Sequence, residues 1–172
     1  HGNIFWNSIN VCFGEDGLSG TTLTCAPLFH IGGLNVTTLL SLGKGVEVVL
    51  LRSFDAGEVL SLIEKHQVTT MFGAPTMFLM MVQHESFAST DLSSIATLTC
   101  GGAPVPVPLI KTYGERGINF CQGYGLTETA PFASLLASDL AMVKVGSAGK
   151  APMFTEVRIV DEQNNPVAAG VH

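Results

Sequence analysis

Short β-prone segments alternate with helix-like segments along most of this chain, and this alternation constrains the fold more than any other feature. Strands are expected at residues 21–25, 46–51, 69–72, 95–100 and 118–121. Helices are expected at residues 4–13, 33–42, 56–65, 75–84 and 106–117. Such alternation predicts an α/β fold with right-handed crossovers, in which a mostly parallel sheet of about five or more strands carries helices on both faces.

Several helix boundaries follow from local signals. We expect Asn3 to cap the first helix and Gly43 to end the second. Asp55, with Glu58 three residues later, has the spacing of a capping box at the start of the third helix. The helix at 75–84 is apolar nearly all round, which predicts that it is buried or faces a ligand cavity.

The C-terminal end differs from the rest. Residues 155–161 alternate apolar and polar side chains, and the Asn-Asn-Pro run at 164–166 has the composition of a turn. We therefore expect the chain to end in a β-hairpin. This divides it into an α/β subdomain at residues 1–150, and the start of a hairpin at 151–172 that belongs to the next subdomain.

Three loops with unusual chemistry each follow a strand-like segment. Residues 26–33 read APLFHIGG, residues 101–104 read GGAP, and residues 122–129 read QGYGLTET. In an open parallel sheet, ligands bind beyond the carboxyl ends of the strands, so these loops are expected to converge. Glycine-rich runs alone are weak signals. Here they accompany an aromatic ring, a hydroxyl and a carboxylate, a set that suits a nucleotide.

Together the loops resemble three motifs of the adenylate-forming (AMP-binding) family, which includes acyl-CoA synthetases, luciferases and the adenylation domains of peptide synthetases. Residues 124–129 look like the most diagnostic motif of that family. Residues 26–30 resemble its aromatic–histidine motif, and residues 102–104 resemble the segment that lines the adenine. The resemblance spans essentially the whole chain, and its order and rough spacing fit.

The resemblance also implies missing parts. The phosphate loop of the family would end just before His1, and its ribose-binding aspartate would lie beyond His172. The C-terminal domain with its catalytic lysine would follow later. The chain therefore resembles an internal piece of the large N-terminal domain, and we expect it to be inactive alone.

The implied reaction joins a carboxylic acid to a thiol at the expense of ATP. The acid attacks the α-phosphorus and pyrophosphate leaves; coenzyme A then displaces AMP from the acyl-adenylate. ATP/AMP and Mg²⁺ are thus the implied cofactors, and CoA is the co-substrate. Phosphoryl chemistry of this kind depends on positioning and charge neutralisation.

The resemblance assigns roles to single residues. The implied nucleotide-binding residues are Gly101, Gly102, Ala103, Pro104, Gln122, Gly123, Tyr124, Gly125 and Thr127. The implied catalytic residues are Thr127, Glu128 and His30, with Glu128 also holding the metal. The implied acyl-substrate residues are Phe29, His30, Gly125, Leu126 and Phe132.

Ordinary structural roles remain open for some of these residues. Thr127 has the alternative of a turn hydroxyl that bonds local backbone. His30 is equally well explained as a gate near the acyl carboxylate or as a packed histidine, and a role as general base is not favoured. Tyr124 can stack on adenine while its ring is half-buried.

The acid is expected to be a fatty or other apolar acid. Its pocket is expected to be lined by residues near 29–34, by the helix at 75–84 and by residues 123–134. The apolar, pliable side chains that would suit it are Met77, Phe78, Met80 and Met81 in the helix, with Phe132 and Leu135 later. No charged side chain is expected there to pair with an ammonium group, which disfavours an adenylation domain of a peptide synthetase. The same methionines have the alternative of plain core.

Composition argues against a nucleic-acid-binding protein and against a membrane-spanning helix. Charged residues make up 13% of the chain and the net charge is −6, so no basic stripe is available for nucleic acid. No apolar run reaches the length of a transmembrane helix. The four cysteines lack zinc spacing. Cys25, Cys100 and Cys121 lie in strand-like runs, which indicates buried thiols and a reducing, cytoplasmic location.

Two functions from other classes are alternatives to a ligase. A non-catalytic nucleotide-binding module would keep the loops and lose the chemistry. A dinucleotide-dependent oxidoreductase is disfavoured, because no G-x-G-x-x-G run opens a helix after the first strand.

Overall fold

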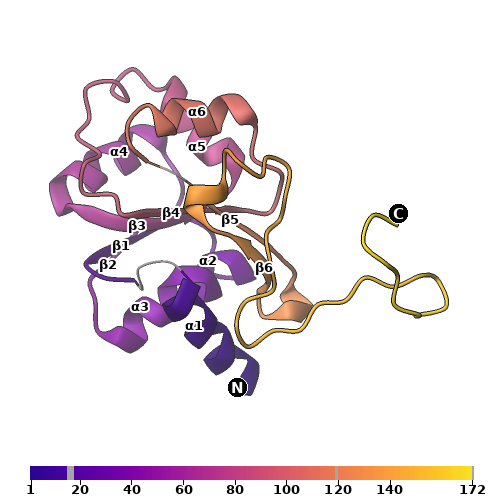
Figure 1. Cartoon of the computed structure of the whole chain (residues 1–172). Coiled ribbons are helices and arrows are strands. Elements are labelled where there is room, and N and C mark those ends of the chain that lie inside the picture. Colours follow the sequence, from indigo (N-terminus) through magenta and orange to yellow (C-terminus); the bar gives the residue numbers. More distant parts are fainter. Residues whose placement is uncertain (15–17, 119, 172) are drawn as a thin grey trace.

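The computed structural model of the chain describes residues 1–14, 18–118 and 120–171. Within these residues the strands form one sheet in the order β2-β1-β3-β4-β5-β6 (Figure 1). Their bounds are β1 Thr21–Thr24, β2 Val48–Leu50, β3 Val68–Gly73, β4 Thr97–Gly101, β5 Phe120–Gly125 and β6 Phe132–Leu136. Strands β1 to β5 pair in parallel, and β6 pairs antiparallel with β5. The predicted mostly parallel sheet is confirmed; residue 119 of the predicted strand 118–121 lies outside the described residues.

Helices cover both faces of the sheet, as predicted. Helices α4 (Ala56–His66), α5 (Pro75–Gln83) and α6 (Val107–Gly114) lie on one face (Figure 1). On the other face lie α1 (Gly2–Gly14), α2 (Ile31–Gly33), the π-helical segment Leu34–Thr38 and α3 (Leu39–Lys44). Short 3₁₀ turns occur at Thr127–Thr129 and Ser138–Leu140. None of the helices in the described ranges combines the length and apolar character needed to cross a membrane.

Two predicted helix boundaries are wrong. Helix α1 begins at Gly2, so Asn3 lies inside its first turn and is not the cap. Gly43 lies within α3, which ends at Lys44 and is capped by Gly45, where φ is +69°. A left-handed residue at this point lets the backbone N–H of Gly45 bond the carbonyls of Ser41 and Leu42, and glycine adopts that conformation without steric cost.

The predicted start of α4 is confirmed. The side chain of Asp55 accepts a hydrogen bond of 2.8 Å from the backbone N–H of Glu58. The prediction that α5 is buried or faces a ligand cavity is correct for only part of the helix: Pro75, Thr76 and Met77 line a cavity described below. Phe78 and Met81 are buried, whereas Leu79 and Met80 are 42% and 52% exposed. An apolar helix whose axis lies on a sheet still turns about 100° per residue, so one side remains open.

The main core lies between the sheet and helices α4, α5 and α6. Phe78, Tyr113 and Phe120 are each 0% exposed, and their rings meet edge to face. The Tyr113 hydroxyl donates to the carbonyl of Phe78 at 3.2 Å, which satisfies its one buried polar group. This contact ties α6 to α5 over the strands.

The prediction of buried thiols is confirmed for the three cysteines in or beside strands. Cys25, Cys100 and Cys121 are buried, and Cys12 is half-buried. Burial raises the pKa of Cys25 and of Cys100 to about 12. These two thiols therefore stay protonated near neutral pH.

The predicted C-terminal hairpin is only partly formed. One isolated antiparallel bridge joins Val160 to Pro166, and the carboxylate of Asp161 accepts the backbone N–H of Asn165 in the turn between them. No described residue after 150 belongs to a named strand or helix. The segment contacts the body where Phe154 packs on Trp6, and then extends away from it (Figure 1).

Candidate active site

A cavity of about 320 Å³ lies at the carboxyl ends of β1, β3, β4 and β5. The strand order β2-β1-β3-β4-β5 places the topological switch point between β1 and β3, where ligands bind in doubly wound sheets. The lining comes from the carboxyl ends of these strands, from the loops and helices that follow them, and from the start of β6: Ala26, Pro27, His30, Ile31, Gly32, Val36, Phe72, Ala74, Pro75, Thr76, Met77, Gly101, Gly102, Ala103, Gly123, Gly125, Pro131 and Phe132. Residues from all three predicted loops therefore converge on one cavity.

Glycines bring the backbone of β4 and β5 up to this cavity. Gly101 and Gly123 are direct partners in the parallel ladder. Gly102 follows with φ +86°, and no atom lies within 4 Å of the position where a Cβ would stand. A left-handed residue with open space beside it leaves its main chain accessible, which is what close approach to a flat ligand requires.

His30 is held at the edge of the cavity by the turn it caps. Its Nδ1 accepts a hydrogen bond of 3.0 Å from the backbone N–H of Gly32, at the start of α2. With Nδ1 engaged as an acceptor, the neutral ring carries its proton on Nε2, which is left to donate. His30 lines the cavity and is exposed, so tight packing does not explain its position.

The turn that carries Thr127 and Glu128 is stabilised by a neighbouring hydroxyl. The Thr129 side chain accepts the backbone N–H of Leu126 at 2.8 Å and also contacts the carbonyl of Pro131. Thr129, and not Thr127, thus bonds the local backbone. Both Thr127 and Glu128 are exposed, and within the described part of the chain no side-chain hydrogen bond involves either of them.

Gln122 is buried just below the glycines with part of its amide unsatisfied. The side chain is 9% exposed, and its terminal nitrogen has no hydrogen-bond partner in the described residues. A buried amide without a partner costs roughly 1–3 kcal/mol, so such groups call for a ligand, a water or a functional reason. Its ladder partner Cys100 is apolar and offers no compensation.

The predicted site residues fall into two groups. Seven line the cavity: His30, Gly101, Gly102, Ala103, Gly123, Gly125 and Phe132. The others do not line it: Phe29, Pro104, Gln122, Tyr124, Leu126, Thr127 and Glu128. Phe29 is 95% exposed, while Tyr124 and Leu126 are about half exposed at 53% and 49%.

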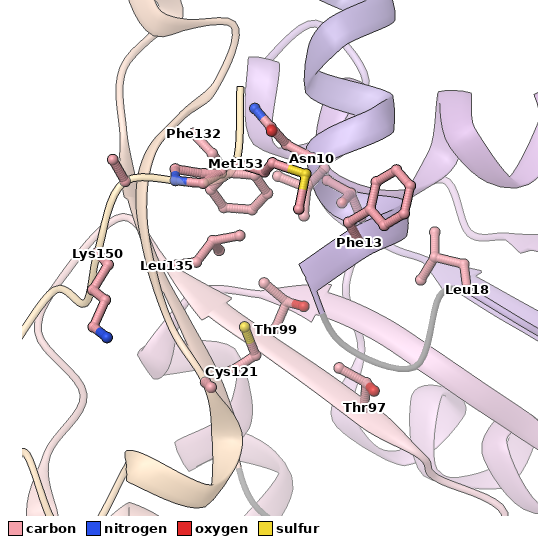
Figure 2. Close-up of a pocket in the computed structure, with 15 residues that line it drawn as sticks. Asn10, Phe13, Leu18, Thr97, Thr99, Cys121, Phe132, Leu135, Lys150 and Met153 are labelled. Carbon is pink, nitrogen blue, oxygen red and sulfur yellow. The ribbon is translucent and has the colours of Figure 1, made fainter. Parts of the chain in front are cut away.

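The predicted acyl lining from α5 needs correction. Of the four side chains predicted from this helix, only Met77, in the first turn, lines the cavity. Phe78 and Met81 belong to the core, and Met80 faces outward, because helical rotation turns successive side chains away from the strand ends. Leu135 lines a second cavity, of about 180 Å³, on the same face of the sheet (Figure 2).

Sequence reasoning missed three side chains of the lining. They are Val36 in the π-helical segment, Phe72 near the end of β3, and Ala74 just before α5. Phe72 could have been found from its position, because it stands near the carboxyl end of a strand, next to the loop. Side chains alternate along a strand, so Phe72 shares a face with Thr70. No comparable signal marks Val36, since the π-helical turn depends on tertiary contacts.

The cavity carries little charge of its own. His30 is the single titratable side chain among its lining residues. In the described ranges no group of three or more His, Cys, Asp or Glu side chains is arranged to hold a metal ion. The exposed carboxylate of Glu128 stands close in sequence to the lining residues Gly125 and Pro131.

These features define a class: a doubly wound α/β protein whose ligand site is built from glycine-rich loops at the ends of parallel strands. The whole chain, residues 1–172, matches the family described as AMP-binding enzyme. The chain therefore belongs to the AMP-binding enzyme family, as the resemblance of its three loops indicated.

Relatives and solved structures agree with this assignment. The chain is 45% identical over 171 residues to a feruloyl-CoA synthase from an Amycolatopsis species, which covers 99% of this chain and 35% of that protein. It superimposes on the N-terminal domain of FACL13 from Mycobacterium tuberculosis with a TM-score of 0.91 and 33% sequence identity. The match covers 97% of this chain and 43% of the FACL13 chain. O-succinylbenzoate coenzyme A synthetase (MenE) from Bacillus subtilis, in complex with ATP and magnesium ion, gives a TM-score of 0.86 and 29% sequence identity. The match covers 97% of this chain and 34% of the MenE chain.

The chain spans about a third of the length of the curated relatives it matches, such as the 35% of the feruloyl-CoA synthase. Homologues named in these comparisons are CoA ligases.

Proposed function

We propose that this chain supplies the nucleotide-binding and acid-binding part of an ATP-dependent acid–CoA ligase. One observation carries the proposal: loops that follow β1, β3, β4 and β5 meet around one cavity, at the switch point of a doubly wound sheet. The membership of the chain in the AMP-binding family supports the same conclusion. The complete ligase joins a carboxylic acid to ATP, releases pyrophosphate, and transfers the acyl group from AMP to the thiol of CoA.

The adenine of ATP is assigned to the open main chain at Gly102 and Ala103. The half-exposed ring of Tyr124 offers a face for stacking, which is worth about 1–3 kcal/mol per base. The unsatisfied amide of Gln122 offers a buried hydrogen-bonding group beneath the same strands. A bound group that reached this amide from the end of β5 would satisfy it, so the unpaired atom supports a ligand near this strand end.

Mg²⁺ fits the residues present, because this ion keeps several waters and uses only one or two carboxylates together with substrate phosphates. Glu128 would hold it, and Thr127 would bond the α-phosphate. Both side chains are exposed and make no competing side-chain hydrogen bond within the described residues. When bound, the ion neutralises charge on the phosphates.

The acid is assigned to the part of the cavity between His30, Gly125 and Phe132. His30, with Nδ1 bonded to the Gly32 amide, presents Nε2–H to a carboxylate oxygen. Phe132, Phe72 and Ile31 make the rest of this part apolar, so the acid is an apolar one. MenE was solved with ATP and magnesium ion, which supports the nucleotide and the metal for this chain.

Residues 1–150 form the α/β subdomain in this proposal, and the segment from 151 begins the next one. The loss of regular structure among the described residues after 150 supports the boundary, although Thr155 still bonds Asn10 of α1. We infer that the isolated chain does not turn over substrate. Pyrophosphate release from ATP and an apolar acid by the isolated chain would contradict that inference.

The test is Glu128→Gln in the full-length ligase. We expect acid-dependent pyrophosphate release to fall about 10²–10³-fold, a loss typical of removing one group that stabilises developing charge. Glu85→Gln, an exposed glutamate after α5, is the matched control and should keep wild-type activity. A nucleotide-binding module without catalysis would show no acid-dependent pyrophosphate release at all, and equal rates for Glu128→Gln and wild type would refute the role of Glu128.

A further inference from the structure

Two pairs of buried hydroxyl groups join β1 to the π-helical segment and to α3. The Oγ1 atoms of Thr24 and Thr38 lie 2.8 Å apart, and the hydroxyl oxygens of Thr22 and Ser41 lie 2.7 Å apart. All four side chains are at most 3% exposed. Buried hydroxyls need hydrogen-bond partners, and each pair supplies them. The pair formed by Thr24 and Thr38 also continues, through a further bond, toward the candidate active site.

Thr24 and Thr38 form a directed chain of two hydrogen bonds. The Thr38 hydroxyl donates to the carbonyl of Gly33 at 2.7 Å. A threonine hydroxyl carries one proton, so Thr38 has none left for Thr24, and Thr24 is the donor in the bond between them. The chain therefore runs from the last residue of β1, over Thr38, to the last residue of α2.

The bond from Thr38 has the spacing of a π-helical turn. In an α-helix a threonine hydroxyl bonds the carbonyl three or four residues earlier, whereas Gly33 stands five residues before Thr38. The backbone has the same spacing here, because the N–H of Leu39 bonds the carbonyl of Leu34. π-Helical turns are rare and often occur at functional sites. The Thr38 hydroxyl thus stabilises the π-helical form of this segment over the α-helical form.

The peptide group between Gly33 and Leu34 is held at both ends, and it belongs to the turn that carries His30. Its carbonyl accepts from Thr38, and its N–H donates to the carbonyl of His30 at 3.2 Å. The N–H of Gly32 bonds the His30 ring at Nδ1. A Cβ on Gly33 would overlap the carbonyl oxygen of Pro27, so the turn lies tightly against the preceding loop. A fixed Gly33 carbonyl therefore fixes both the main chain and the ring of His30.

We propose that Thr38 is a positioning residue for His30: its hydroxyl, which accepts from Thr24, fixes the turn that directs the Nε2–H of His30 into the site cavity. The inference rests on the proposed function, in which that N–H meets a carboxylate oxygen of the acid. Thr38 is buried and does not line the cavity, so it acts through the turn and not by contact with the acid. Without its hydroxyl, the Gly33 carbonyl loses a buried donor, and the ring keeps its chemistry but loses its fixed direction.

The experiment measures kcat/KM for the acid in acid-dependent pyrophosphate release by the full-length ligase. Thr38→Val keeps the shape of the side chain and removes the hydroxyl. We expect it to lower kcat/KM about tenfold or more, because a displacement of about 1 Å can cost about 10²-fold. Thr38→Ser retains a hydroxyl and should recover most of this loss. Thr24→Val removes only the outer bond and should give a smaller loss, which keeps the test valid if Thr38→Val does not fold.

A double-mutant cycle with His30→Ala shows whether Thr38 acts through the histidine. If it does, Thr38→Val should cost little further activity once the ring is absent, so the two losses should be far from additive. Equal losses from Thr38→Val with and without the His30 ring would overturn the proposal. Wild-type activity in His30→Ala would overturn it as well, because the residue to be positioned would then have no role.

Ser41→Ala is the matched control, because it removes another buried hydroxyl that bonds β1 about one helical turn beyond Thr38. Ser41→Ala and Thr38→Val should both lower the midpoint of denaturant unfolding, but Ser41→Ala should keep the wild-type kcat/KM. Equal losses of kcat/KM in the two variants would indicate general destabilisation and overturn the proposal. Unchanged kcat/KM in Thr38→Val, with an active wild type, would overturn it and leave the proposed function intact. A wild type that activates no acid would overturn the proposed function itself.

Discussion

Alternate residues of the same strands build two very different faces of the sheet. Toward α4, α5 and α6, β4 and β5 present Leu98, Cys100 and Phe120, which are 0–2% exposed and packed against aromatic rings. Toward α1 and α2, the intervening residues include Thr99 and Gly123, which border two cavities. The packed face fixes the positions of the strands, so the hollow face is free to carry glycines and empty space for ligands.

The largest expected difference between the faces concerns stability. We expect Phe120→Ala to lower the free energy of unfolding of the full-length protein by about 3–5 kcal/mol, because it leaves a void among fully buried rings. Phe29→Ala, at a side chain that is 95% exposed, should change it by less than about 0.5 kcal/mol. Denaturant titration measures both. A loss below about 1 kcal/mol for Phe120→Ala would mean that the packed face does not hold the sheet together.

A smaller effect is expected where the hollow face is tight. Gly123→Ala places a methyl group against the Phe132 ring, and overpacking of this kind costs about 1–3 kcal/mol. The displaced Phe132 ring would move into the cavity that it lines, so kcat/KM for acid activation should fall as well. Phe132→Leu should relieve the overlap, so a double-mutant cycle on stability and kcat/KM is expected to show coupling. Simple additivity would show that the ring does not rest on Gly123.

The smallest effect is a pH dependence from the buried thiols. Burial raises the pKa of Cys25 and of Cys100 from 9.0 to about 12, so the unfolded chain loses these protons before the native protein does. The stability that the two thiols contribute is complete below pH 9 and is lost as the pH rises toward 12. At pH 9 the loss is about 0.4 kcal/mol per thiol. The test compares the unfolding free energies of wild type and Cys100→Ala between pH 8 and 9.5. The free energy of wild type should fall more steeply with pH, and equal pH slopes would contradict the contribution of Cys100.

Much of the fold followed from local signals in the sequence. Asp55 with Glu58 predicted the start of α4, because capping chemistry depends on residues three apart. Loops rich in glycine predicted the ends of β1 and β4, whereas β5 continues to Gly125, four residues beyond its predicted end, so half of the predicted loop 122–129 is strand. Where the prediction was correct, the signal and the structure lie within the same few residues.

Features that depend on distant contacts were not predictable. The π-helical turn at 34–38 accompanies hydrogen bonds from Thr38 to Gly33 and with Thr24 of β1. Strand β6, with the sequence FASLL, lacks an alternating pattern and is defined by pairing with β5. Phe132 was predicted to contact the acid, but its position between two cavities depends on α1, β5 and segment 150–153 together.

The central claim is that loops 101–104 and 122–129 form a nucleotide site. A crystal structure of the full-length protein with ATP and Mg²⁺ tests it most directly. We predict adenine between the main chain of Ala103 and the ring of Tyr124, with the amide of Gln122 satisfied and the phosphates beside Thr127 and Glu128. Nucleotide bound elsewhere, with the Gln122 amide still unpaired, would contradict the account.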